Sequence, residues 1–218
     1  TLIVTIRDEK HGAIMAHGYA QATGRPGVCA STFGPGASNL ATGLLEALQS
    51  SVPVIAIVQD HPIAVRGRNA ASELDHQAAL APYAKAVLRI DFPEQAADRT
   101  RKALRIATSG RPGPVVLLCP TDVMSLEAEA DVSADGRFAF APALRTRPAQ
   151  EDIADAARLL SDARRPVIVA GGGAVISSAF EEVRQLHEHL GIPVVTTMTG
   201  KGALALLEEL SKTAAIVS

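Results

Sequence analysis

Short runs of β-branched residues alternate with helix-length segments along most of this chain. The apolar runs at residues 2–6, 28–32, 52–58, 84–90 and 115–118 are expected strands, and the segments 10–23, 37–50, 73–80 and 93–108 between them are expected helices. Strands that alternate with helices form βαβ units, whose strands are parallel. Aromatic residues make up only 3% and Trp is absent, so the core must be aliphatic. The sequence therefore predicts an α/β fold, a parallel sheet with helices on both faces.

The alternation stops at residues 125–148, an acidic and proline-containing stretch without a clear period. We expect this stretch to be an interdomain linker. A second series follows, with helices at 150–160 and 180–190 and strands at 166–170 and 192–196. Two strands are too few for a sheet with two covered faces. The pattern thus indicates an incomplete second Rossmann-like α/β domain.

Charge and hydropathy exclude several classes of protein. The net charge is −2 and the basic residues are scattered, which argues against a nucleic-acid surface. No apolar run approaches the length of a membrane span. Cys29 and Cys119 lie within apolar runs and are interpreted as buried free thiols. With no signal peptide at the start of the chain, we expect a cytoplasmic protein.

Glu9 is the first candidate for chemistry. It follows the expected strand at 2–6 and begins a helix, and ligands of open α/β sheets collect at this edge. An acid in the first turn also stabilises a helix through its dipole, so Glu9 alone is compatible with a purely structural role. Gly34-Pro35-Gly36 forms a second strand-to-helix turn, where the missing side chains let a flat ligand approach the backbone.

Several motifs together resemble one family. They are found, in the family's order and spacing, at residues 7–13, 15–20, 32–40, 51–54, 109–115, 120–123, 165–173 and 191–195. In these the chain is similar to the thiamine diphosphate enzymes of the acetolactate synthase, pyruvate oxidase and benzoylformate decarboxylase family. The resemblance implies a pyrimidine-binding domain at 1–124 without its first strand and helix, a linker at 125–148, and part of the central domain at 149–218. The diphosphate-binding domain, with its Gly-Asp-Gly signature, has no counterpart here, so the chain is expected to be inactive alone.

The resemblance assigns roles to individual residues. Glu9 matches the glutamate that hydrogen-bonds a ring nitrogen of the cofactor's aminopyrimidine and so activates thiamine diphosphate. The expected cofactor contacts are Glu9, Thr32, Phe33, Gly34, Pro35, Gly36 and Asn39. The implied reaction is decarboxylation or carboligation of a 2-oxo acid by a homodimer or homotetramer. Mg²⁺ would be held by the missing C-terminal domain.

Other positions are candidates for binding a substrate or a nucleotide. The expected substrate contacts are Phe33, His61, Ser72 and His76. Gly171, Gly172 and Gly173 follow a strand and precede a helix, which is a place for nucleotide phosphates, and FAD is one candidate. No histidine spacing suggests a metal site.

Some residues depart from the family pattern. Ala71 and Ser72 replace the Phe-Gln of a Phe-Gln-Glu run, Asp60 stands where a glutamine is expected, and Phe33 replaces the usual Ser. These positions border the expected substrate pocket, so they leave open which 2-oxo acid is used and whether acetolactate is formed.

Two other functions remain open. One is a non-catalytic nucleotide-binding or regulatory α/β module, although such a module has no need for an acid aimed at a ring. The other is a dinucleotide-dependent oxidoreductase, but no Gly-x-Gly-x-x-Gly follows the first expected strand.

Overall fold

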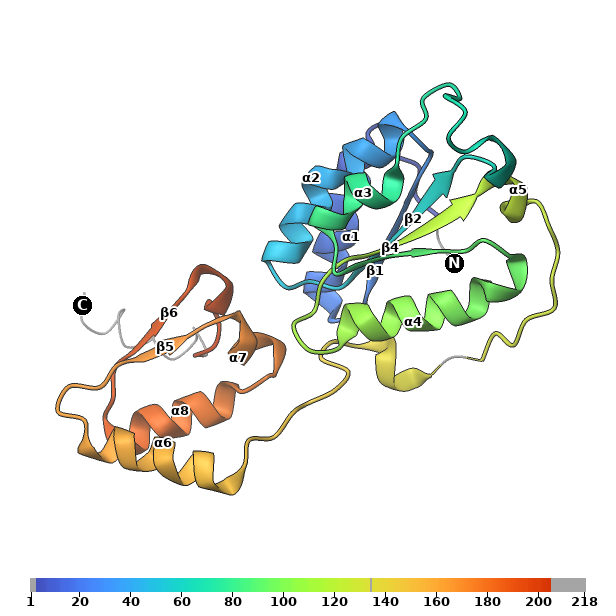
Figure 1. The fold of residues 1–218 in the computed structure, drawn as a ribbon. Coiled ribbons are helices and arrows are strands. Elements are labelled where there is room, and N and C mark those ends of the chain that lie inside the picture. Colours follow the sequence, from blue (N-terminus) through green and yellow to red (C-terminus); the bar gives the residue numbers. More distant parts are fainter. Residues whose placement is uncertain (1–2, 134, 205–218) are drawn as a thin grey trace. The chain divides into compact units, whose positions relative to one another are not determined.

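The computed structural model describes residues 3–133 and 135–204, in two compact units that divide between Leu144 and Arg145 (Figure 1). The helices and strands of the first unit are α1 (Glu9–Thr23), β1 (Gly27–Ser31), α2 (Pro35–Gln49), β2 (Val54–Asp60), α3 (His76–Leu80), β3 (Ala86–Arg89), α4 (Ala96–Thr108), β4 (Val115–Pro120) and α5 (Thr121–Met124). The four strands form one parallel sheet in the order β1-β2-β4-β3. The predicted α/β class and parallel sheet are confirmed.

Helices cover both faces of this sheet, as predicted. On one face α1 and α2 pack over β1 and β2, with α3 beside α2 over β4, and on the other lies α4 (Figure 1). The first face has a core of buried aliphatic residues that includes Leu40, Leu44 and Val58, and the second includes Ile55 and Leu117. The central strands β2 and β4 are therefore apolar along nearly their whole length, as is typical of parallel sheets.

Small residues bring α1 close to its neighbours. A Cβ at Gly27 would lie 2.0 Å from the backbone oxygen of Ala16, and a Cβ at Gly43 would lie 2.5 Å from the Ala13 Cβ. Glycine at both positions lets α1 pack tightly against β1 and α2. Gly24 ends α1 in the left-handed conformation, with φ 69°, as its position after the predicted helix indicates.

The expected strand at residues 2–6 is wrong for the residues that the structure describes. Residues 3–6 have no regular structure, and Leu2 lies outside the described residues. A strand needs a hydrogen-bonded neighbour, and no strand of the described sheet pairs with this segment. Instead Ile6 packs on α1, where a Cβ at Gly12 would lie 2.5 Å from the Ile6 Cδ1.

The second unit contains α6 (Gln150–Asp162), β5 (Ile168–Ala170), α7 (Gly172–Ile176), α8 (Phe180–Leu190) and β6 (Val194–Thr196). Its two strands pair in parallel, and residues 205–218 lie outside the described residues. The sequence does not predict the short helix α7, because three consecutive glycines have a low helix propensity. This arrangement agrees with a second, incomplete α/β domain.

Part of the segment between the two series packs on the first unit. The short 3₁₀ helix η4 (Gly136–Ala139) contributes the buried Phe138. The amide of Ala141 donates to Gly24 O, and that of Ala143 to Thr108 O, each at 2.9 Å. Apolar burial and these hydrogen bonds explain why the first unit extends to Leu144. Across the described residues, we find no helix with the length and apolar character needed to span a membrane.

Candidate active site

The start of α1 brings a carboxylate to the carboxyl edge of the sheet. Asp8 caps the helix, because its Oδ1 accepts a hydrogen bond from the Lys10 amide at 2.9 Å. This backbone hydrogen bond lowers the pKa of Asp8. The cap sets the first helical residue at Glu9, whose side chain is half-buried. Glu9 thus reaches the edge through the packing of α1 and not, as expected, from the end of a strand.

Glu9 faces the first two turns of α2. Its Oε2 accepts a hydrogen bond from Asn39 Nδ2 at 3.1 Å. A Cβ at Gly36 would lie 3.1 Å from the Glu9 Oε1 and 2.7 Å from the Thr32 Cγ2. The absence of a side chain at Gly36 therefore leaves space beside the Oε1 of Glu9, while Asn39 donates a hydrogen bond to the other oxygen.

The Gly-Pro-Gly turn connects β1 to α2. Gly34 has φ 61°, a conformation that favours glycine, and Pro35 is the first residue of the helix. A Cβ at Gly34 would lie 2.6 Å from the Ser72 backbone oxygen, so the loop before α3 covers the turn closely. Thr32, just before the turn, donates from Oγ1 to the Oε1 of Gln59 at 2.9 Å.

A buried chain of hydrogen bonds ends at the same turn. The amide of Gly34 donates to His76 Nε2 at 2.8 Å, and the Nδ1 of His76 lies 2.8 Å from the Asp60 Oδ1. An amide can only donate, so Nε2 is the acceptor and the ring proton is on Nδ1, facing Asp60. The side chain of His76 is fully buried, and that of Asp60 is 4% exposed. Each polar atom in this series of hydrogen bonds therefore needs its hydrogen-bond partner.

Two arginines neutralise Asp60. Its Oδ2 contacts the guanidinium groups of Arg89, at the end of β3, and of Arg66, at 3.4 Å. Its Oδ1 also accepts from the amide of His61 at 2.9 Å. Burial raises the pKa of Asp60, but the hydrogen bond from His76 and the charge of Arg89 outweigh it, so the pKa lies below its ordinary value. Asp60 is thus an ionised carboxylate within a hydrogen-bonded network.

His61 lies beside this chain and contacts the residue before the turn. Its ring centroid is 4.4 Å from that of Phe33, and its Nε2 donates to the Ala71 carbonyl at 3.0 Å. The Nδ1 of His61 is buried, with no hydrogen-bond partner in the described part of the chain. Ligand atoms of Asp60, His61 and His76 lie within 4.8 Å of one another. Because His76 uses both ring nitrogens and Asp60 contacts two guanidinium groups, this cluster is better suited to hydrogen bonding than to a cation.

The loop above the turn is organised by another carboxylate. Glu73 accepts hydrogen bonds from the amides of Gly67 and, at 2.8 Å, of Ala70. These backbone hydrogen bonds lower the pKa of Glu73. Ser72 has φ 61° and an exposed side chain, while its backbone covers Gly34. Glu73 therefore holds the loop that closes the turn.

Comparison with known proteins accounts for this arrangement. Residues 2–80 match the family model described as thiamine pyrophosphate enzyme, N-terminal TPP binding domain, and residues 153–213 match its central domain. The chain belongs to the thiamine pyrophosphate enzymes. This confirms the resemblance seen in the sequence motifs. Glu9, the Gly34-Pro35-Gly36 turn and Asn39 all lie within the first matched range.

Curated relatives of this thiamine pyrophosphate enzyme are named as acetolactate synthases. A probable acetolactate synthase large subunit of Methanocaldococcus jannaschii is 41% identical over 206 residues, which are 91% of this chain and 34% of that protein. An acetolactate synthase of Arthrospira platensis is 38% identical over 200 residues, 90% of this chain and 34% of that protein. One of Mycobacterium leprae is 36% identical over 207 residues, 92% of this chain and 32% of that protein. The chain thus spans about a third of the length of these relatives.

The expected site residues fall into two places in the enzyme. Those of the first unit meet at the carboxyl edge of the sheet: Glu9, Thr32, Phe33, Gly34, Pro35, Gly36, Asn39, His61, Ser72 and His76. Gly171, Gly172 and Gly173 belong to the second unit, at the carboxyl end of β5. A Cβ at Gly172 would lie 2.9 Å from the Thr199 Oγ1, so packing alone accounts for a glycine there. A nucleotide at these glycines stays a prediction.

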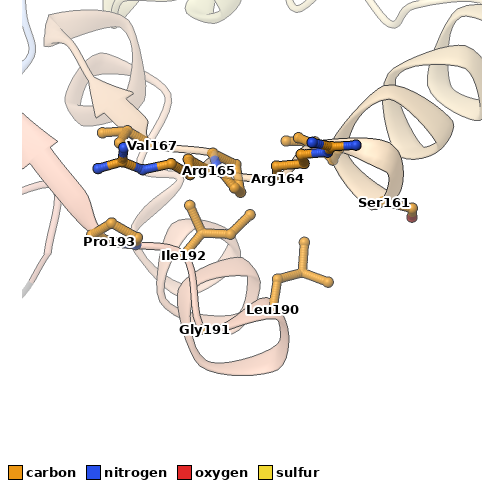
Figure 2. A pocket seen from close by; sticks show the side chains of 11 residues that line it. Ser161, Arg164, Arg165, Val167, Leu190, Gly191, Ile192 and Pro193 are labelled. Atoms are coloured by element: carbon orange, nitrogen blue, oxygen red, sulfur yellow. The ribbon is translucent and has the colours of Figure 1, made fainter.

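A surface hollow of the second unit lies elsewhere. It is lined by the end of α6 and by the segments before β5 and β6, with Arg164, Arg165, Leu190 and Ile192 around it (Figure 2). These segments lead into the strands, whereas Gly171 follows the carboxyl end of β5. The hollow therefore contains none of the expected site residues.

The sequence does not indicate the partners of Asp60. In the sequence Asp60 stands out only because it replaces a glutamine, and no motif marks Arg66 or Arg89. A local signal is present, because Asp60 is the one charged residue of β2 and Arg89 the one charged residue of β3. Both close apolar strands at the edge where ligands collect.

Proposed function

We propose that this chain holds and activates the aminopyrimidine ring of thiamine diphosphate in an enzyme that acts on 2-oxo acids, by decarboxylation, carboligation or both. The observation that carries the proposal is the pairing of Glu9 with Asn39 beside Gly36. One carboxylate oxygen accepts a hydrogen bond from Asn39, and the residue beside the other oxygen, Gly36, has no side chain. These residues fit a flat, hydrogen-bonding heterocycle.

In this proposal each residue has a defined task. Asn39 orients the Glu9 carboxylate, and Glu9 Oε1 shares a proton with a ring nitrogen in a charge-assisted hydrogen bond. The Gly34-Pro35-Gly36 turn supports the ring, with Thr32 and Phe33 beside it. When bound, the cofactor supplies a carbon nucleophile and an electron sink for the 2-oxo acid.

We propose the remaining expectations on the family relationship. Residues 1–124 serve as the pyrimidine-binding domain, 125–148 as the connection and 149–218 as part of the central domain. Phe33, His61, Ser72 and His76 surround the substrate end of the site, and Mg²⁺ binds the diphosphate through residues outside this sequence. We also propose that the protein is cytoplasmic and assembles as a homodimer or homotetramer. FAD is the candidate ligand of Gly171, Gly172 and Gly173. The acetolactate synthases among the relatives support carboligation of 2-oxo acids as the reaction class.

The substitution Glu9→Gln in the full-length protein tests the function. We expect turnover of 2-oxo acids to fall by about two orders of magnitude or more, because an amide cannot share the proton. Binding of thiamine diphosphate, measured by calorimetry, should change much less. Glu46→Gln is the matched control, since Glu46 lies on α2 and its side chain accepts a hydrogen bond from Ser50 Oγ at 3.0 Å. Near-normal turnover by Glu9→Gln would contradict the assignment and favour a non-catalytic module.

A further inference from the structure

The hydrogen bonds that connect Asp60, His76 and Gly34 take no part in the proposed reaction itself. They end, however, at the turn that is expected to support the cofactor. His76 is fully buried and both of its ring nitrogens are engaged, by Asp60 and by the Gly34 amide. Such a side chain has no atom left with which to bind a substrate. Its contacts are those of a residue that holds a backbone group in place.

Gly34 depends on this contact. Its amide is buried, and α2 has no side-chain cap at this position. With φ 61° and ψ −118°, Gly34 is outside the helical conformation, so its amide has no partner within α2. Without the imidazole nitrogen it would be an unsatisfied buried donor, which is costly. His76 therefore takes the place of a helix cap for the Gly-Pro-Gly turn.

The contact with the Gly34 amide requires Nε2 of His76 to accept a hydrogen bond. An imidazolium has a proton on both nitrogens and cannot accept from an amide. Asp60 accepts the Nδ1 proton of His76 through Oδ1, and Arg89 and Arg66 contact its other oxygen. The amide of His61 takes part of the charge on Oδ1 at 2.9 Å. The carboxylate thus orients the ring as a neutral Nδ1–H tautomer, with the lone pair of Nε2 toward Gly34.

We propose that His76 is a positioning residue, which, oriented by Asp60, holds the Gly34 amide and thereby fixes the turn that receives the aminopyrimidine ring of thiamine diphosphate. This inference rests on the proposed function. It moves His76 from the substrate contacts to the support of the cofactor turn. The geometry extends the site to the ends of β2 and β3, because Asp60 and Arg89 close those strands.

Two substitutions separate the two hydrogen bonds of the ring. In His76→Gln the amide oxygen can occupy the place of Nε2 and accept from Gly34, whereas His76→Asn keeps a donor near Nδ1 and loses that acceptor. Dissociation constants for thiamine diphosphate with Mg²⁺, measured by calorimetry on the full-length protein, should rise at least about tenfold for Asn. For Gln they should stay within about threefold of the native value. Turnover at saturating cofactor should fall less than affinity in both.

Hydrogen exchange gives a readout that does not need the cofactor. The Gly34 amide should be protected in the native apoprotein, should exchange at least about tenfold faster in His76→Asn, and should keep most of its protection in His76→Gln. Exchange of the Gly34 amide in the native protein as fast as in exposed loops would overturn the proposal even if no variant folds. Equal loss of affinity in both variants would also overturn it, because it would indicate a packing role.

The failure of the proposed function has a different signature. If the native full-length protein does not bind thiamine diphosphate, the function fails, while the exchange of Gly34 still reports on the hydrogen bond. Glu9→Gln provides the complementary control, because it should lose turnover and leave Gly34 protection unchanged. A positioning role is therefore read from affinity and exchange, and a catalytic role from turnover.

Discussion

The absence of one carbon atom, the Cβ of residue 36, leaves space beside the Glu9 carboxylate for the proposed aminopyrimidine ring. The gap beside its Oε1 exists because residue 36 has no Cβ, and a methyl group there would lie 3.1 Å from that oxygen and 2.7 Å from the Thr32 Cγ2. Contacts this short force a neighbour to move. Both neighbours are side chains, and the half-buried side chain of Glu9 can move away from such a methyl group.

The substitution Gly36→Ala tests this space. We expect turnover to fall at least about tenfold, since a displaced carboxylate is poorly aligned for proton sharing. Gly18→Ala is the matched control, because Gly18 lies on α1 and a Cβ there would meet nothing within 4 Å. The control should keep full activity and gain roughly 0.5–1 kcal/mol in helix stability. Steady-state turnover and thermal unfolding of both variants measure the two effects, and equal activity would refute the steric argument.

At the scale of elements, Asp60 ties three strand and helix ends together. It contacts Arg89 at the end of β3 and His76 at the start of α3, and it closes β2 itself. Such a buried carboxylate costs little only while all its partners are present. The network therefore links the carboxyl ends of the sheet to the loop that covers the turn.

The substitution Asp60→Asn should lower the free energy of unfolding by about 3 kcal/mol at neutral pH, because it removes the buried carboxylate that pairs with Arg89 and Arg66. The pKa of Asp60 is lowered in the folded state, so its stabilisation is present above the unfolded-state pKa near ~3.9 and is lost as the pH falls through the lower folded value. The difference between native and variant should shrink below about pH 4. Urea titrations over this pH range, read by hydrogen exchange in β2 and β4, measure it.

Asp98→Asn is the control for this prediction. Its side chain is 85% exposed and pairs with Arg101, three residues along α4. Exposed pairs contribute about 0–1 kcal/mol, so we expect little change at any pH. A pH-independent difference between the native protein and Asp60→Asn would show that the ionised carboxylate is not what stabilises the sheet edge.

Elements were predictable from the sequence where their signals are local. The end of α1 follows from Gly24, and the apolar runs of β2 and β4 required burial on both faces. The second helix was expected at 37–50, and α2 begins two residues earlier because Pro35 fits the first position of a helix. The strand expected at 2–6 failed because strand formation depends on a partner elsewhere. The series of hydrogen bonds from Asp60 through His76 to Gly34 could not be predicted for a similar reason. Its bonds connect residues 16 and 42 positions apart, which no local pattern reveals.

At the scale of the whole molecule, burial in the aliphatic interior determines how reactive the two cysteine thiols are. Cys29 lies on β1 and Cys119 on β4, and both are buried free thiols, as the sequence predicts. Burial raises the pKa of Cys29 to about 12. Burial and the nearby charge of Asp60 raise the pKa of Cys119. Because a thiolate is the reactive form, both cysteines should be inert as long as the sheet and its covering helices stay assembled.

Thiol labelling therefore reports on the integrity of the whole first unit. At about pH 8, where an ordinary thiol is partly ionised, an alkylating reagent should leave Cys29 and Cys119 unmodified in the native protein and modify both in urea. Ser125→Cys supplies the control, because this exposed position after α5 should react at once in the folded state. Peptide mass spectrometry identifies each labelled site. Rapid native labelling of Cys29 would mean that α1 leaves the sheet readily, and a helix that does so could not hold Glu9 against α2.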